Sequence, residues 1–464
     1  MELSEYGLYG LGVMGQSLAK NIINHHYSLS VYNYESEVTQ KFIKANPNEN
    51  LKGFEELKLF VESLKKPRKI ITIVTAGAAT ESVINQLLEF LEAGDSILNF
   101  ANTFFEDSNR YNETAKLKNC HYFSVGISGG QAGALNGACL MPSGNQEVFK
   151  EIKPFLEDIS ATAEDGKTCA NYVGEGSSGH YVKMVHNGIE YGDIQLICDT
   201  YEIMKKGLKI SNDDMSEIFK EWNLGKLNSY LIEITSKILQ TKDDLSNEYL
   251  LDQVKDIARS KGTGKWTSIE SMNLGVSIPT IVEALNSRYL SEKKDQRVSA
   301  SKIYKNNAIE NADLSINELE NALYTCKIIC YAQGFELLEE ASRKYSWDLK
   351  LDSIAANWRA GCIIKAKLLD NITEALENGY ENIIMSEVFQ DEIKDNIKDL
   401  RKVVAYAVTN GIYIPSLVSS LEYFDGMTSE RTSANLVQAQ RDFFGAHTYE
   451  RCDRSGSFHT IWEK

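Results

Sequence analysis

Short apolar runs alternate with longer polar stretches over roughly the first third of the chain. The apolar runs are rich in β-branched and aromatic residues, which is typical of buried strands, whereas the polar stretches repeat their apolar positions as amphipathic helices do. Helices are predicted at Gln16–Asn24 and Thr80–Leu91. Because strands alternate with helices, we expect a parallel sheet that helices cover on both faces. The predicted strands are Ser4–Tyr9, Leu29–Asn33, Lys69–Thr75, Ser96–Phe100 and His121–Val125.

The pattern changes after residue 178, where strand-like runs disappear and helical spacing takes over. Apolar residues then recur at intervals of three and four, as at Ile194, Ile197, Tyr201 and Met204. Proline is nearly absent from this part, so long helices are not interrupted. We therefore predict a large all-helical region after the mixed one.

The end of the chain is predicted to form a helix at Arg431–Phe444 that stops at Gly445 and is followed by a tail. The tail carries more aromatic and basic side chains than a terminus without contacts needs, and we expect it to pack on another subunit. These side chains are His447, Arg451, His459 and Trp462.

Composition and charge narrow the possible partners. The 464 residues include 49 Lys and Arg against 65 Asp and Glu, which gives a formal net charge of −16, and 43% of them are hydrophobic. These are proportions of a folded globular protein. An acidic protein repels phosphate backbones, so nucleic acid and anionic membranes are not expected as partners. An anionic small substrate would need a local cluster of Lys and Arg.

The sequence also bears on location. It contains no run of about 18 apolar residues that could span a membrane. The first ten residues lack the basic and apolar regions of a signal peptide. The 8 cysteines have no disulfide or zinc spacing, so we predict free thiols in a reducing cytoplasm and no metal site.

A glycine-rich turn follows the first predicted strand and opens a helix, with the sequence GLGVMG. Gly10 allows the tight turn, Gly12 lets a pyrophosphate approach the backbone, and Gly15 lets the helix pack on the strand. Val13 and Met14 begin the helix, whose free N–H groups would face the phosphates. The turn predicts an α/β Rossmann-type N-terminal domain that binds a dinucleotide.

The choice of dinucleotide depends on the end of the second predicted strand, which continues as Asn33, Tyr34 and Glu35. An acidic residue about 20 positions beyond the glycines binds a ribose hydroxyl in NAD enzymes, and Glu35 has that spacing. No Lys or Arg lies between Asn33 and Val38 to bind a 2′-phosphate. We therefore predict NAD in preference to NADP; the alternative is that Glu35 only faces water.

A polar face is predicted on the helix that begins the second region. Lys183, His186, Asn187 and Glu190 stand at positions i, i+3, i+4 and i+7 and share one side. A solvated polar face is the alternative interpretation. Against it, the mid-helix pair Asn187-Gly188 costs about 1 kcal/mol or more. A neutral lysine could remove a hydroxyl proton during hydride transfer, and a glutamate could protonate the enol left after CO2 loss.

Four stretches together resemble the 6-phosphogluconate dehydrogenase family: HYVKMVHNGIEYGDIQL, KGTGKWTS, KDQRVSASK and QAQRDFFGAHTYER. The resemblance runs from Gly10 to the C-terminal tail. It implies oxidative decarboxylation of 6-phosphogluconate to ribulose 5-phosphate and CO2 in the pentose phosphate pathway, with reduction of NAD(P). The wider 3-hydroxyacid dehydrogenases share the lysine-asparagine helix but lack the other three motifs.

The resemblance also implies roles for single residues. Lys183 is expected to act as general base and Glu190 as general acid. Asn102 is expected to lie near both the substrate and the nicotinamide. The substrate's carboxylate end and hydroxyls are expected to contact Ser128, Gly129, Gly130, His186 and Asn187.

The resemblance further implies a phosphate site shared between two subunits of a homodimer. A dianionic phosphate on so acidic a protein needs positive groups, and guanidinium binds it at two points. Residues of the same chain in this site are Tyr191, Lys261, Thr263 and Arg288, and those of the partner are Arg441 and His447. The implied division is a dinucleotide-binding domain at 1–178, an all-helical substrate and dimerisation domain at 179–430, and a C-terminal helix and tail at 431–464.

The sequence departs from the family pattern at several positions. Gly12 replaces an alanine, Tyr34-Glu35 replaces Arg-Thr, and Thr75 replaces a frequent lysine, and all three changes favour NAD. Near the nicotinamide, Phe100 and Gln131 also differ from the family. Two alternatives therefore stay open: a 3-hydroxyacid dehydrogenase acting on another acid, and a catalytically impaired dinucleotide-binding protein.

Overall fold

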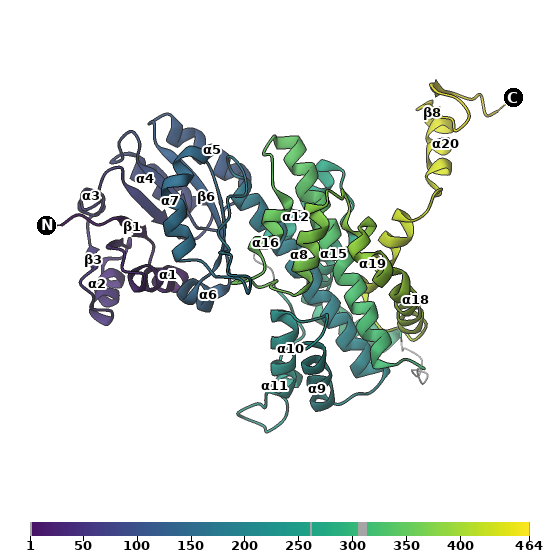
Figure 1. The fold of residues 1–464 in the computed structure, drawn as a ribbon. Coiled ribbons are helices and arrows are strands. Elements are labelled where there is room, and N and C mark those ends of the chain that lie inside the picture. The colour runs from purple at the N-terminus through teal and green to yellow at the C-terminus, as the bar shows by residue number, and fades with distance from the viewer. Residues whose placement is uncertain (1, 260–261, 305–312, 464) are drawn as a thin grey trace.

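The computed structural model describes residues 2–259, 262–304 and 313–463. An α/β N-terminal part is followed by a large helical part and a C-terminal arm (Figure 1). This confirms the predicted fold class. Among the described residues, no helix is both long and apolar enough to cross a membrane.

The N-terminal part is built on a seven-stranded sheet in the order β3-β2-β1-β4-β5-β6-β7. All neighbouring strands are parallel except β6 and β7, which are antiparallel. The strand order reverses direction between β1 and β4, and ligands bind beyond the carboxyl ends of the strands at such a point. The strands are β1 (Tyr6–Tyr9), β2 (Leu29–Tyr32), β3 (Leu51–Phe54), β4 (Lys69–Thr72), β5 (Ser96–Asn99), β6 (His121–Ser128) and β7 (Cys139–Ser143).

Helices cover both faces of the sheet, as the sequence predicted. Apolar side chains of three helices form one core with β1, β2 and β5, namely α1 (Val13–Asn24), α2 (Ser36–Ala45) and α7 (Gln146–Asp158). Three others form a second core on the opposite face: α3 (Leu57–Glu62), α4 (Ala78–Leu88) and α5 (Phe105–Lys116). A short helix, α6 (Gly130–Asn136), packs against α1.

The sequence prediction missed the two edge strands. β3 carries Lys52 and Gly53, and β7 contains Pro142, so neither resembles a buried central strand. At the edge of a sheet a proline loses no necessary ladder hydrogen bond. The predicted end of one central strand was also wrong, because β4 ends at Thr72 and not at Thr75.

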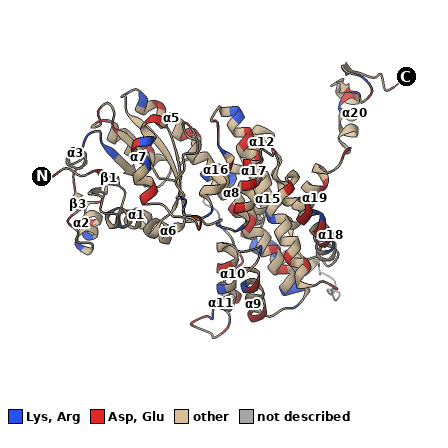
Figure 2. Ribbon diagram, viewed as in Figure 1, with Lys and Arg blue, Asp and Glu red and all other residues tan. Residues whose placement is uncertain are grey.

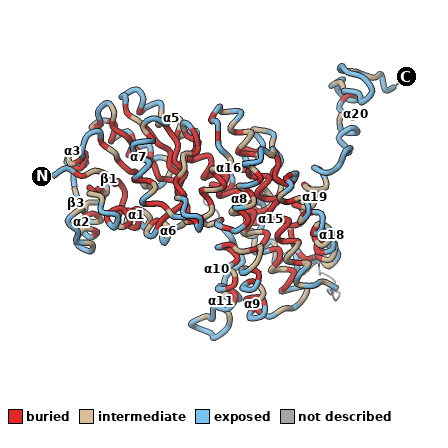
Figure 3. Tube along the Cα trace, viewed as in Figure 1, coloured by how far each residue is buried: buried red, intermediate tan, exposed pale blue. Residues whose placement is uncertain are grey.

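Two long helices form the centre of the helical part. α8 (Ser178–Glu202) and α15 (Ile316–Tyr345) pack against each other and are buried over most of their length (Figure 3). A π-helical turn, Ile203–Gly207, continues α8. The surrounding helices are α9 (Asn212–Trp222), α10 (Tyr230–Gln240), α11 (Leu250–Gln253), α12 (Thr263–Leu274), α13 (Pro279–Glu292), α14 (Lys294–Ile303), α16 (Leu351–Asn357), α17 (Leu368–Glu377), the 3-10 turn Ile383–Met385, α18 (Glu387–Thr409) and α19 (Pro415–Met427).

The C-terminal arm stands away from the rest of the chain (Figure 1). It consists of α20 (Ala434–Gly445) and a hairpin of β8 (Tyr449–Glu450) and β9 (Ser457–Phe458). The predicted helix began three residues too early and ended one residue too early. Several large apolar side chains of the arm are exposed: Leu436, Val437, Phe443, Phe444, Ile461 and Trp462.

Charged side chains are spread over all three parts of the chain, with acidic residues frequent on the helices (Figure 2). The net charge of −16 means that an anionic ligand must be bound by local groups.

Candidate active site

The glycine-rich turn joins β1 to α1 in a backbone conformation that depends on glycine at two positions. Gly10 has φ +113°, and a Cβ there would lie 2.4 Å from the carbonyl oxygen of Ile73. A Cβ at Gly15 would lie 1.9 Å from the carbonyl oxygen of Gly10. The N–H of Leu11 donates to Asn33 Oδ1 at 2.9 Å, which fixes the turn against the end of β2.

Gly12 differs from the other two glycines, because a Cβ there would meet no atom within 4 Å. Gly12 is the N-cap of α1, no side chain caps the helix, and its first turn contains no acidic residue. The free N–H groups therefore face open space, as a bound pyrophosphate requires. The turn fits a dinucleotide.

A cavity of about 840 Å³ lies beyond the carboxyl ends of the central strands. It is lined by the glycine turn, the loops after β4, β5 and β6, and the first half of α8. Both predicted sites thus open into one space. The predicted residues that line it are Gly10, Gly12, Val13, Met14, Gly15, Asn33, Thr75, Asn102, Ser128, Gly129, Gly130, Lys183, Asn187, Glu190 and Thr263.

The polar face of α8 is buried and not solvated. Lys183 is 7% exposed and His186 is 0% exposed. Lys183 Nζ lies 3.3 Å from His186 Nδ1, which also lies 3.0 Å from Asn187 Oδ1. Glu190 Oε2 is 3.9 Å from the same ring nitrogen. The solvated-face alternative is therefore wrong for Lys183, His186 and Asn187, whereas Glu190 is partly exposed.

Burial changes the acid-base properties of the lysine. Desolvation lowers the pKa of Lys183 below its ordinary value, although Glu190, Cys362 and Cys139 act in the opposite direction. A lower pKa increases the share of uncharged amine near neutral pH. An uncharged amine beside the dinucleotide turn can accept a proton from a bound hydroxyl group.

Small residues allow α8 to be buried so completely. A Cβ at Gly126 on β6 would lie 2.6 Å from Lys183 Cβ, and one at Gly179 would lie 2.3 Å from the carbonyl oxygen of Met141. On the other side, a Cβ at Gly188 would lie 2.6 Å from Thr267 Cγ2 on α12. The mid-helix glycine that seemed costly from the sequence is thus a point of close helix packing.

The turn after β6 forms one wall of the cavity. Gly129 and Gly130 have φ values of +119° and +61°, and a Cβ at Gly129 would lie 2.4 Å from the carbonyl oxygen of Gly361. Ser128 Oγ lies 3.1 Å from His186 Nε2 and accepts a hydrogen bond from the N–H of Ile363 at 3.3 Å. This wall is therefore linked to both α8 and the segment before α17.

The loop after β5 carries Asn102 to the cavity and is organised by Asn99. Asn99 Oδ1 accepts the N–H of Ala101 at 3.0 Å, and Asn99 Nδ2 donates to Tyr122 Oη at 2.8 Å. The carbonyl oxygen of Asn99 also contacts His180 Nε2 at 3.0 Å, which connects the loop to α8. Phe100, which departs from the family pattern, is accommodated in this loop and is buried at the cavity wall.

The predicted phosphate residues are only partly brought together. Thr263 lines the cavity, whereas Tyr191 is buried beside it with the Arg288 guanidinium carbon 3.6 Å from its ring centroid. Lys261 lies outside the described residues. Arg441 and His447 are on the C-terminal arm, which does not reach the cavity within one chain.

The residues on which the choice of dinucleotide depended do not all face the cavity. Asn33 and Thr75 line it, whereas Tyr34 is 80% exposed. Glu35 is exposed at the N-terminus of α2, where its Oε2 accepts from Asn33 Nδ2 at 3.3 Å. Tyr34 and Glu35 do not line the cavity.

Some cavity residues were not assigned from the sequence. Trp266 and Ile363 line the cavity, and Cys362 lies beneath it against His186. Trp266 could have been found because it stands within the KGTGKWTS motif. Ile363 and Cys362 lie in an irregular segment whose apolar residues have no periodic pattern, so no sequence signal identifies them.

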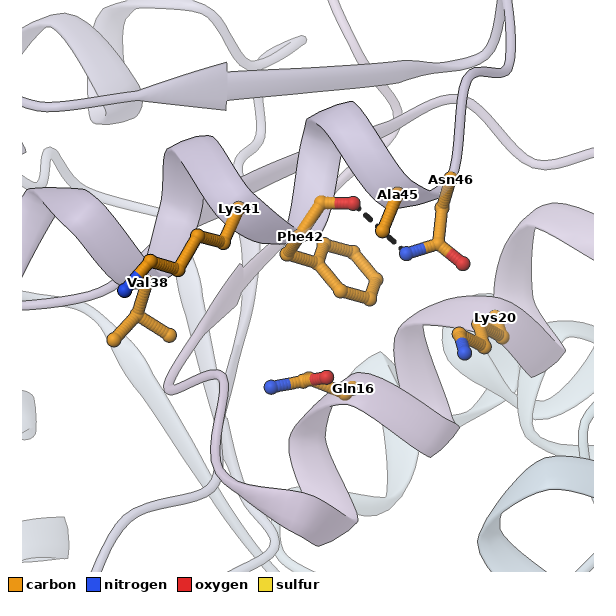
Figure 4. Close-up of a pocket in the computed structure, with 7 residues that line it drawn as sticks. All are labelled: Gln16, Lys20, Val38, Lys41, Phe42, Ala45 and Asn46. Atoms are coloured by element: carbon orange, nitrogen blue, oxygen red, sulfur yellow. Dashed lines mark hydrogen bonds between the residues drawn. The ribbon is translucent and has the colours of Figure 1, made fainter.

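A second cavity, of about 430 Å³, lies between α1 and α2 (Figure 4). Gln16 and Lys20 face it from α1, and Lys41 and Phe42 face it from α2. It shares no lining residue with the larger cavity and has neither the glycine turn nor the buried lysine. Within the described ranges, no cluster of His, Cys, Asp or Glu is arranged to hold a metal ion.

A dinucleotide turn and a buried lysine that share one cavity define a class of protein, the dinucleotide-dependent dehydrogenases. Comparison with known families agrees with this class. Residues 5–174 match the NAD binding domain of 6-phosphogluconate dehydrogenase, and residues 179–462 match the C-terminal domain of 6-phosphogluconate dehydrogenase. The chain belongs to the 6-phosphogluconate dehydrogenase family.

Relatives match over the whole chain. The decarboxylating 6-phosphogluconate dehydrogenase of Shigella flexneri is 44% identical over 467 residues, which is 100% of both chains. The NADP(+)-dependent decarboxylating enzyme of Bacillus subtilis is 44% identical over 470 residues, again 100% of both. Plasmodium falciparum 6-phosphogluconate dehydrogenase superposes with a TM-score of 0.96 at 44% identity, covering 99% of this chain and 100% of the other.

The predicted preference for NAD over NADP is wrong by these comparisons. The Bacillus subtilis relative is NADP(+)-dependent, and the Plasmodium falciparum enzyme was solved with its cofactor NADP+ and with its substrate 6-phosphogluconate. The physical reason lies in the structure: the prediction relied on Glu35 as a ribose ligand, and Glu35 is exposed outside the cavity. A missing arginine in one loop does not by itself exclude a 2′-phosphate.

Proposed function

We propose that this protein is an NAD(P)-dependent enzyme that converts 6-phosphogluconate to ribulose 5-phosphate and CO2. The observation that carries the proposal is the burial of Lys183 in the same cavity as the Gly10–Gly15 turn. A bound nicotinamide dinucleotide would supply the hydride acceptor. Full-length similarity to decarboxylating enzymes supports this substrate over that of another 3-hydroxyacid dehydrogenase.

In this proposal the residues of α8 handle protons. Lys183 accepts the hydroxyl proton as the hydride leaves, because its lowered pKa favours the free amine. Glu190, one turn beyond His186, returns a proton to carbon after CO2 is lost. The sugar acid would be held by Asn102, Ser128, Gly129, Gly130, His186 and Asn187.

We further propose a homodimer with shared phosphate sites. The arm is supported as a dimer contact by its exposed apolar side chains, which a single chain leaves in water. Arg441 and His447 would then reach the partner's cavity, where Tyr191, Lys261, Thr263 and Arg288 hold the phosphate. The corresponding division is 1–178, 179–430 and 431–464, and the 8 free cysteines support a cytoplasmic location.

The proposal is tested by replacing the amine without shortening the side chain. Lys183→Met should lower turnover of 6-phosphogluconate by at least about 100-fold, because a positioned proton acceptor contributes that much or more. The measurement is reduced-dinucleotide formation together with CO2 release, with NADP and NAD compared. Lys206→Met, which changes an exposed lysine just after the same helix, is the matched control. Substantial turnover by Lys183→Met would exclude Lys183 as the base.

A further inference from the structure

A cysteine lies directly beneath the polar face of α8. Cys362, in the segment between α16 and α17, is 5% exposed, and its Sγ lies 2.7 Å from His186 Nε2. The segment is held from both sides: Gly361 O accepts the N–H of Cys139 on β7 at 2.9 Å, and the N–H of Ile363 donates to Ser128 Oγ. The thiol is therefore fixed in place against the imidazole ring.

The ring of His186 has defined neighbours at each nitrogen. Nδ1 lies 3.0 Å from Asn187 Oδ1 and 3.3 Å from Lys183 Nζ. Nε2 lies close to Cys362 Sγ and 3.1 Å from Ser128 Oγ. The ring also packs edge-on against Trp358, with centroids 5.6 Å apart. The orientation of the ring is thus restricted, and its hydrogen-bond partners decide which nitrogen carries the proton.

The neighbours favour one tautomer. An amide oxygen only accepts, so the contact with Asn187 Oδ1 needs a proton on Nδ1. The neutral ring then has a lone pair on Nε2, which needs a donor. Cys362 is the nearer group at this nitrogen. Burial opposes ionisation of its thiol, but the hydrogen bond with Cys139 and the neighbouring His186 and Lys183 together lower the pKa of Cys362, and a more acidic thiol donates more strongly to a ring nitrogen. Ser128 Oγ is the more distant group at this nitrogen.

We propose that Cys362 is a positioning residue, whose thiol donates to His186 Nε2 and keeps the ring in the Nδ1–H tautomer. In that tautomer Asn187 Oδ1 is occupied by the ring, and the amide N–H groups are left for the substrate. In the other tautomer Nδ1 would accept a hydrogen bond from Lys183 Nζ and stabilise its ammonium form. The thiol thus keeps the lysine available as a base; this consequence rests on the proposed function.

Several charged or titratable groups surround this lysine, and a pH effect must be judged against all of them. Glu190 faces it from α8, Cys139 from β7, and Cys362 from the segment before α17, in addition to His186. Cys362 itself raises the pKa of Lys183, so losing that direct effect alone would move the acid limb toward lower pH. A shift toward higher pH therefore reports the link through His186.

The test compares Cys362→Ala, which removes the donor, with Cys362→Ser, which keeps an O–H donor of similar size. For Cys362→Ala we expect kcat to fall about tenfold, since a misplaced group can cost up to about 100-fold. The acid limb of its pH profile should also move toward higher pH, and Cys362→Ser should restore both. Cys169→Ala, another buried thiol whose Sγ contacts Ala356 O, is the control and should change neither.

A second measurement does not depend on turnover. Nitrogen-15 NMR of the labelled histidines, of which the chain has 7, distinguishes the two tautomers, and His186→Asn assigns the signal. We expect Nδ1–H for His186 in the wild type and in Cys362→Ser, and its loss in Cys362→Ala. If the NMR signals behave as expected but the wild-type protein does not turn over 6-phosphogluconate, the proposed function fails and the role of the Cys362 thiol in fixing the tautomer still stands. An unchanged His186 signal and pH profile in folded Cys362→Ala would overturn the inference.

Discussion

Gly188 shows how one residue shapes the candidate site. It lies where α12 packs closely against α8, and the Thr267 hydroxyl donates to the carbonyl oxygen of Met184 at 2.8 Å. The absent side chain lets the two helices meet beside Asn187, so that Thr263 at the start of α12 reaches the cavity. The residue is thus explained by packing and not by flexibility.

Gly188→Ala should destabilise the protein by about 1–3 kcal/mol, because its Cβ would lie 2.6 Å from Thr267 Cγ2. Urea unfolding measures the change. Gly426→Ala is the matched control, since a Cβ at this helical glycine meets no atom within 4 Å, and we expect a gain of about 0.5–1 kcal/mol there. Equal effects of the two substitutions would contradict the close packing of α8 and α12.

At the scale of elements, α8 is connected to α19 by a buried carboxylate. Asp199 Oδ2 accepts the N–H of Ser416 at 2.8 Å and of Leu417 at 3.0 Å, at the N-terminus of α19. Gln195 Nε2 donates to the other oxygen at 2.8 Å. Burial is the largest influence and raises the pKa of Asp199 to about 7, although these hydrogen bonds act against it.

This raised pKa predicts a pH effect on stability. The unfolded chain releases the proton of Asp199 near its ordinary pKa of 3.8, whereas the folded chain retains it up to about 7. The folded state therefore binds more protons in this interval, and the group's contribution falls as pH rises, by up to about 1.4 kcal/mol per pH unit. Asp199→Asn should lose this slope while keeping an oxygen for the helix N-terminus. Urea unfolding of both proteins across the interval measures the difference; parallel curves would refute it.

At the scale of the whole molecule, the C-terminal arm stands away from the cavity of its own chain (Figure 1). Several of its apolar side chains are exposed, and Arg441 Nη1 donates to Gln438 Oε1 of the same helix at 3.0 Å. In a homodimer built as proposed, each cavity would take its lysine from one chain and its arginine from the other. This arrangement is testable without a structure of the dimer.

Mixing two inactive variants should restore activity. In a mixed dimer of Lys183→Ala and Arg441→Ala, one site carries both substitutions and the other carries neither. Random exchange places half of the chains in mixed dimers, so we expect about one quarter of wild-type activity after denaturation and refolding together. Arg401→Ala, which removes an exposed arginine paired with Asp425, replaces Arg441→Ala in the control mixture. No recovery in the first mixture would exclude shared sites.

Local patterns were sufficient for the parts of the molecule that local chemistry decides. The glycine spacing predicted the turn at Gly10–Gly15, and the interval of three and four residues predicted a common face for Lys183 and Glu190. The edge strands were missed because Lys52 and Pro142 do not resemble buried strand residues. The preference for NAD was wrong because it relied on the charge pattern of one loop, and Glu35 in that loop lies outside the cavity at the start of α2.

The order of residues alone determined which segments are helices and central strands, and which turn can approach a phosphate, since these depend on neighbours along the chain. Only the tertiary structure decided that Lys183 and His186 are buried, because that requires β6, α12 and α15 to pack around α8. It also decided that Cys362 meets His186 across 176 positions of sequence. Contacts between distant segments depend on the sum of many packing interactions, and no spacing within one segment records them.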